Sequence, residues 1–135
     1  MSETENLKLV KHLVEQYMKG NFEPLGAALS EDVVLRLTIA EGTPLSGTFR
    51  GQAGVAEYFS RNAEVVETQA MEVTNFLAGG NQVAVMGRET LLVKRSGRLI
   101  ENADWVMVCT LVGESVASIL IIEDTSEISK AYLPR

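Results

Sequence analysis

Residues 82–112 read QVAVMGRETLLVKRSGRLIENADWVMVCTLV, and this stretch decides the fold class. Its apolar side chains recur with a period of about two, which is typical of β-strands. Ser96 and Gly97 stand between two such runs, where a short turn pair predicts a tight hairpin. The stretch therefore predicts two long antiparallel strands, 82–95 and 98–112, that meet at residues 96 and 97.

Three more strands are predicted around this hairpin. Residues 64–78 precede a Gly79-Gly80-Asn81 turn, and residues 116–123 follow a turn at residues 113–115. An earlier strand is predicted over residues 33–40, in which every second side chain is a larger aliphatic one. Strands of about 12–15 residues exceed the usual length, so the sheet must bend or twist strongly.

Helices are predicted only in the first half of the chain. Ser2 and Glu5 form a capping box before a helix that Gly20 ends. Asn21 can cap a short second helix, with Pro24 in its first turn and residues 25–29 inside it, and a third helix covers residues 52–62. Helices early and strands late predict an α+β domain, in which a curved antiparallel sheet wraps three helices around one apolar pocket.

Composition narrows the classes of function. The chain has 135 residues, which fits a single domain over 1–135, and its net charge of −6 argues against a nucleic-acid partner. Cys109 is the only cysteine and His12 the only histidine, so we expect no disulfide, no metal site and no cofactor. Residues 1–6 do not resemble a signal peptide, and no apolar run approaches the ~20 residues needed to span a bilayer. These features predict a cytoplasmic protein without membrane contact.

The register of the hairpin predicts a site. If residues 96 and 97 alone form the turn, Glu89 lies opposite Asp104 and Leu91 lies opposite Asn102. That face of the sheet is otherwise apolar and includes Val106. Two opposed carboxylates can share one proton, which is typical of an acid/base site. The other face carries Trp105, Met107 and Cys109, and we predict it as the outer surface that forms a homodimer.

The order of several short motifs resembles a known superfamily. These motifs are the first helix, Val33-Val34-Leu35, Phe49-Arg50-Gly51-Gln52, Asn102-Ala103-Asp104-Trp105 and Ile121-Ile122-Glu123-Asp124. Together they are similar to the superfamily of nuclear transport factor 2, ketosteroid isomerase and the SnoaL-like polyketide cyclases. The resemblance covers nearly the whole chain. It implies a cone-shaped fold with an internal pocket and a dimer formed through the outer face of the sheet.

The resemblance also implies roles for individual residues. Tyr17 matches the oxyanion-hole tyrosine of ketosteroid isomerase, and Asp104 matches its protonated aspartic acid and the acid/base aspartate of the cyclases. Leu37 stands where the isomerase has its general base, so this chain departs from the isomerase there. The residues expected to contact the ligand are Glu89, Asn102, Leu37, Tyr58, Phe59 and Val106.

Two classes of function follow from these observations. The first is an isomerase or cyclase that binds a small, apolar, oxygenated molecule and moves a proton next to its carbonyl, with Asp104 as acid/base and Tyr17 as donor. The second is a ligand-binding or dimerising module without catalysis, which the missing first-strand base favours. Epoxide hydrolysis is least favoured, because it needs an Asp-Arg-Asp set and only Arg88 and Asp104 are available, on opposite faces.

Overall fold

The structure is a computed structural model that describes residues 2–38, 43–123 and 132. The elements follow the predicted order with one additional strand. They are α1 (Glu3–Met18), α2 (Glu23–Ala28), β1 (Leu29–Leu37), β2 (Gly47–Arg50), α3 (Gly51–Val65), β3 (Val66–Gly79), β4 (Gln82–Val93), β5 (Arg98–Val112) and β6 (Ser115–Glu123).

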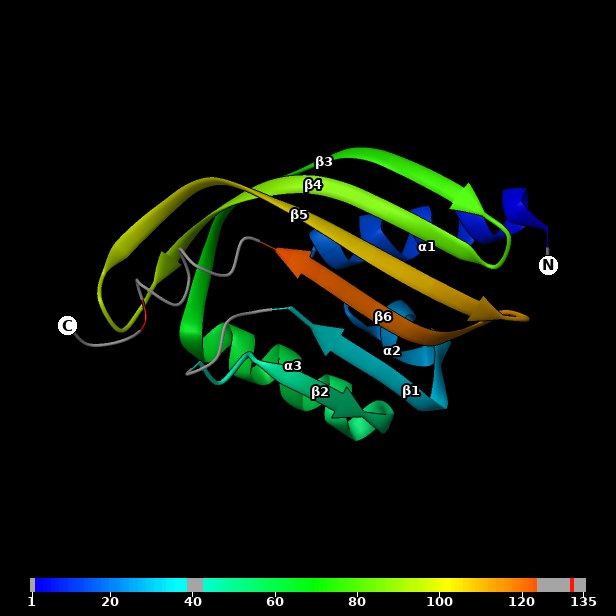
Figure 1. The fold of residues 1–135 in the computed structure, drawn as a ribbon, viewed down its shortest axis with the longest axis horizontal. Helices are drawn as coiled ribbons and strands as arrows, with labels where there is room; N and C mark the ends of the chain where they lie inside the picture. The colour runs from blue at the N-terminus through cyan, green and yellow to red at the C-terminus, as the bar shows by residue number, and fades with distance from the viewer. Residues whose placement is uncertain (1, 39–42, 124–131, 133–135) are drawn as a thin grey trace.

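The strands form one six-stranded sheet in the order β2-β1-β6-β5-β4-β3. All neighbouring pairs are antiparallel except β1 and β6, which run parallel. Figure 1 shows β3, β4 and β5 as long bent ribbons that run side by side over α1, with the helices gathered on one side of the sheet. The prediction of an α+β domain with a curved, mostly antiparallel sheet is confirmed.

The first helix begins where the capping box predicts. The Ser2 hydroxyl accepts a hydrogen bond from the Glu5 backbone N–H at 3.1 Å, and the Ser2 N–H donates to the Glu5 carboxylate at 3.2 Å. Both bonds satisfy N–H groups that have no partner inside a helix. The helix buries Val10 and Leu13. The capping box therefore sets where α1 begins, and the spacing of its apolar residues sets which face is buried.

The hydrophobic core lies between the helices and the inner face of the sheet. It contains side chains from β1, α3 and β4 whose exposed fraction is zero, namely Val33, Leu35, Val55, Val83, Val85 and Val93. Full burial of one such aliphatic side chain stabilises the fold by about 1.5–3 kcal/mol. This core packs α3 against the inner face of the sheet.

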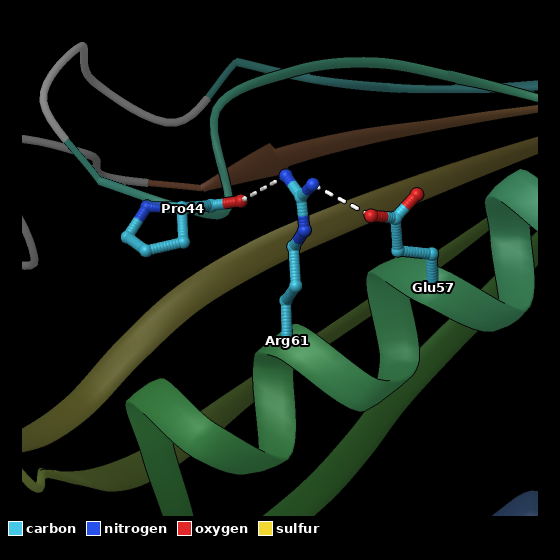
Figure 2. A network of polar contacts seen from close by, with 3 residues as sticks. All are labelled: Pro44, Glu57 and Arg61. Carbon is cyan, nitrogen blue, oxygen red and sulfur yellow. Dashed lines mark hydrogen bonds and ion pairs between the residues drawn. The ribbon is translucent and has the colours of Figure 1, made fainter.

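A polar contact secures the segment before β2 to α3. Figure 2 shows the Arg61 guanidinium between Pro44 and Glu57. It donates to the Pro44 carbonyl at 3.3 Å and meets the Glu57 carboxylate at 2.6 Å. It also lies 5.5 Å from the centre of the Phe49 ring. The contact holds this segment at α3 while the neighbouring Leu45 is buried against the core.

Some element boundaries differ from the prediction. The first strand begins earlier than residue 33, at Leu29, and the third helix is longer, ending at Val65. Residues 47–50 form the short strand β2, but they were predicted as the end of a loop and the lead into the third helix. Four residues are too few to show an alternating pattern. Residues 39–42 and the tail at 124–131 and 133–135 lie outside the described part of the chain.

The predicted two-residue hairpin at residues 96 and 97 is wrong. Val93 pairs with Arg98, so residues 94–97 all belong to the turn. The Gly97 N–H donates to the Val93 carbonyl at 2.8 Å, and Gly97 has a φ of 72°. Glycine reaches this left-handed conformation without steric cost. Because the turn has four residues instead of two, each β4 residue near it pairs with a β5 residue two positions earlier than predicted. A shift of two positions by itself would leave each side chain on its predicted face.

A β-bulge then reverses the face. Leu91 pairs with Ile100 but Glu89 pairs with Ala103, so Thr90 stands against two residues of β5. Asn102 is one of them, with a φ of 51°, and its N–H donates to the Thr90 hydroxyl at 3.2 Å. Beyond this bulge, every β5 side chain occupies the face opposite to the predicted one.

Because of the bulge, the face of the sheet predicted for Trp105, Met107 and Cys109 is wrong. They were predicted on the outer surface, but they lie on the inner face, toward the helices. Val106 and Val108 take the outer face instead, because they alternate with them along β5.

Candidate active site

A pocket lies inside the fold, between α1, α3 and the inner face of β3 to β6. Its cavity volume is about 130 Å³. An engineered cavity of about 150 Å³ is large enough to hold benzene, so a molecule with a single ring matches this space. Most of the lining side chains are aliphatic, aromatic or methionine.

Acidic side chains are the charged groups of this pocket. Glu89 on β4 and Glu123 at the end of β6 both line it. No lysine, arginine or histidine lines the pocket within residues 2–38, 43–123 and 132. The uncharged polar groups include the hydroxyls of Tyr17 and Tyr58. Carboxylates and phenols together can hold and move a proton.

Tyr17 stands in the last turns of α1, and its side chain points into the pocket. Its ring packs against Phe59 of α3, with the ring centres 5.4 Å apart. Burial raises the pKa of the Tyr17 hydroxyl, and the negative charge of Glu89 raises it further. The hydroxyl therefore stays protonated and can donate a hydrogen bond to a ligand.

Tyr58 is the more deeply buried phenol and lies one residue before Phe59 on α3. Burial raises the pKa of Tyr58 strongly, and the charge of Glu123 adds to this effect, followed by Tyr17 and Glu89. These influences show that the two phenols and the two carboxylates share one region of low polarity.

Glu89 lines the pocket because side chains alternate along β4, and its own lies on the same face as Leu91. Its neighbours across the sheet are Met71 and Ala103, so it lies on the inner face. In the described part of the chain, no hydrogen bond or ion pair joins its carboxylate to another residue. A carboxylate in an apolar pocket without a fixed partner is a candidate proton acceptor.

Comparison with known proteins identifies the family. Residues 10–119 match the SnoaL-like domain. The chain belongs to the SnoaL-like family. A nuclear transport factor 2-like protein from Burkholderia xenovorans has 32% sequence identity and a TM-score of 0.85, over 98% of this chain and 99% of that one.

Two more distant structures share the fold of this SnoaL-like protein. One is proposed to be a SnoaL-like polyketide cyclase from Mesorhizobium loti, with 16% identity and a TM-score of 0.73 over 90% of this chain and 98% of that one. The other is proposed to be an isomerase from Rhodopseudomonas palustris, with 16% identity and a TM-score of 0.73 over 93% and 94% of the two chains. No curated protein matches the sequence.

Four of the predicted site residues of the SnoaL-like domain meet in the pocket. They are Tyr17, Glu89, Tyr58 and Phe59. Leu37 is buried, with 6% of its surface exposed, but it stands outside the pocket lining. Sequence reasoning assigned Trp105 to the outer surface and gave Glu123 no role, although both line the pocket.

Asp104, Asn102 and Val106 are not in the pocket, which corrects the predicted site. The Asp104 side chain is 87% exposed on the outer face, where its carboxylate lies 4.0 Å from Arg88. An exposed ion pair of this kind contributes at most about 1 kcal/mol. Asn102 lies in the bulge, where its backbone conformation bends β5. The cause in each case is the one-residue shift that the bulge introduces.

Cys109 lines the pocket but has no reactive character. Burial raises the pKa of its thiol to about 12, so the sulfur remains protonated and weakly nucleophilic at neutral pH. Within the described residues, no three His, Cys, Asp or Glu side chains gather closely enough to hold a metal ion. No described helix combines the length and the apolar character needed to cross a membrane.

Proposed function

We propose that this SnoaL-like protein binds a small, largely apolar, oxygen-bearing molecule in its pocket and moves a proton next to a carbonyl group without a cofactor. The observation that carries this proposal is that Tyr17 and Glu89 both line one largely apolar pocket. The neighbours proposed to be an isomerase and a polyketide cyclase support a reaction on a small molecule.

In this proposal, Glu89 takes the acid/base role that sequence analysis gave to Asp104. The Glu89 carboxylate removes a proton from the carbon beside the carbonyl and later returns it to the substrate. Negative charge then develops on the carbonyl oxygen, and the Tyr17 hydroxyl stabilises that charge by a hydrogen bond. The apolar walls strengthen both interactions because they exclude water.

Hydrogen exchange into a simple ketone tests the proposal directly. The protein is mixed with cyclohexanone in deuterium oxide, and the loss of the α-proton signal is followed by proton NMR. We expect the protein to accelerate this loss above the buffer rate. A bound ketone without faster exchange would favour the second class of function, a ligand-binding module, which the apolar Leu37 on β1 also favours.

We also propose that the protein forms a homodimer through the outer face of the sheet. The support is a band of partly exposed apolar side chains, formed by cross-strand neighbours on three adjacent strands: Met86, Val106, Ile122, Ala84, Val108 and Leu120. A soluble protein rarely exposes a contiguous apolar band of this kind unless a partner covers it.

A charge in the centre of this band is expected to separate the dimer. The Val108→Asp variant should have the mass of one chain in light scattering, whereas the wild type should have twice that mass, because a carboxylate at an apolar interface loses its hydration. The control is Ala56→Asp, an exposed position on α3 away from this face. A wild type that is monomeric at high concentration would refute the proposed dimer.

A further inference from the structure

The charge distribution around the pocket has a direct implication for its ligand. Two carboxylates, Glu89 and Glu123, line a cavity of about 130 Å³, and no basic side chain lines it in the described part of the chain. Glu89, whose carboxylate has no ionic partner among the described residues, places a negative charge in this pocket, and the apolar walls screen that charge less than water would. An anionic ligand would have to enter against this charge.

Uncharged residues line the surface beside the pocket. A second hollow of about 470 Å³ lies between the end of α1 and the first half of β3. It shares Tyr17, Met18, Thr68 and Met71 with the pocket, so the two spaces adjoin. None of the residues that line this outer hollow is charged. The selection by charge therefore falls to Glu89 inside the pocket.

Aromatic rings add to the preference for positive charge. Phe59 lies at the centre of a cluster, with ring centres 5.4 Å from Tyr17 and 5.1 Å from Tyr58. These rings and Trp105 all line the pocket. The face of an aromatic ring attracts cations, and the attraction grows when the cation leaves water.

We propose that the pocket selects its ligand by charge, and that the substrate is a basic single-ring compound with a protonated nitrogen rather than a carboxylic acid or phosphate. This inference rests on the proposed function only in that the same pocket binds the substrate. A protonated nitrogen supplies the positive partner that the Glu89 carboxylate lacks among the described residues, and it lowers the cost of burying that charge.

Three probes of nearly equal shape isolate the effect of charge. Benzoate, benzamide and benzamidinium carry charges of −1, 0 and +1 at neutral pH on the same planar frame. Binding is measured by the fluorescence of Trp105, which is the only tryptophan of the chain and lines the pocket. We expect benzamidinium to bind at least about tenfold more tightly than benzoate, with benzamide between them.

A substitution in the pocket tests whether the preference for the cationic probe arises there. Glu89→Gln should reduce the ratio between benzamidinium and benzoate to roughly threefold or less, because the carboxylate that attracts the cation is lost. The matched control is Glu72→Gln, which removes the same charge from an exposed position of β3 opposite Arg88. It should leave the ratio at the wild-type value.

The outcomes separate this inference from the proposed reaction. Equal or tighter binding of benzoate would overturn the charge selection, and so would an unchanged ratio in Glu89→Gln. If none of the probes binds, both the charge selection and the ligand pocket fail. A clear preference for benzamidinium without any exchange of ketone protons would support the inference and refute the proton transfer.

Discussion

The Glu89→Gln protein is expected to exchange the α-protons of cyclohexanone about 100- to 10,000-fold more slowly than the wild type. Glutamine keeps the shape of the side chain and its place on the inner face of β4, but its amide cannot accept the substrate proton. Because Tyr17 stays in place, the variant should still bind the ketone. The loss should therefore fall on the catalysed rate and leave the ketone concentration at half-saturation nearly unchanged.

This experiment has a control for the loss of a negative charge. Glu72→Gln makes the same chemical change on β3, at an exposed residue that pairs with Arg88 on the outer side of the sheet. It should retain the wild-type exchange rate. A Glu89→Gln protein that is folded by circular dichroism and still exchanges at full rate would show that Glu89 is not the base.

The Gly87→Ala protein is expected to lose about 2–3 kcal/mol of its free energy of unfolding. Gly87 pairs with Trp105 across β4 and β5. A Cβ atom at residue 87 would lie 2.5 Å from Cζ2 of the Trp105 indole and would also collide with the Glu72 carbonyl oxygen. The backbone of β3 cannot move away without breaking sheet hydrogen bonds, so the indole must leave its place in the pocket wall.

Urea unfolding followed by circular dichroism measures this loss, and the fluorescence maximum of Trp105 reports whether the indole has moved. The control is Gly79→Ala at the end of β3, where a Cβ atom would meet no other atom within 4 Å. That variant should keep the stability of the wild type to within about 0.5 kcal/mol. Equal stability of the two variants would mean that the contact between Gly87 and Trp105 is easily relieved.

Local patterns in the sequence were sufficient for most of the fold. The capping box at Ser2 and Glu5 predicted the start of α1, and period-two alternation predicted β3, β4, β5 and β6 to within about two residues at each end. Helical spacing placed Tyr17, Tyr58 and Phe59 on the apolar faces of the first and third helices, and all three line the pocket.

The exposed position of Asp104 could not be predicted because the face that it occupies depends on register. A shift of one residue between two strands exchanges the two faces, whereas the pattern of either strand alone is unchanged by it. Asn102 was a signal for the shift, since asparagine tolerates a positive φ better than most residues. That signal is weak, because asparagine is also common at ordinary positions of loops and strands.

The sequence by itself determined the fold class, the order of the three helices and the five longer strands, and the acidic charge of this protein, since each depends on local periodicity or composition. Only the tertiary structure decided that Trp105 lines the pocket while Asp104 faces solvent. The reason is physical: the bulge at Asn102 forms only when β4 and β5 pair, and its single extra residue reverses every side chain that follows on β5.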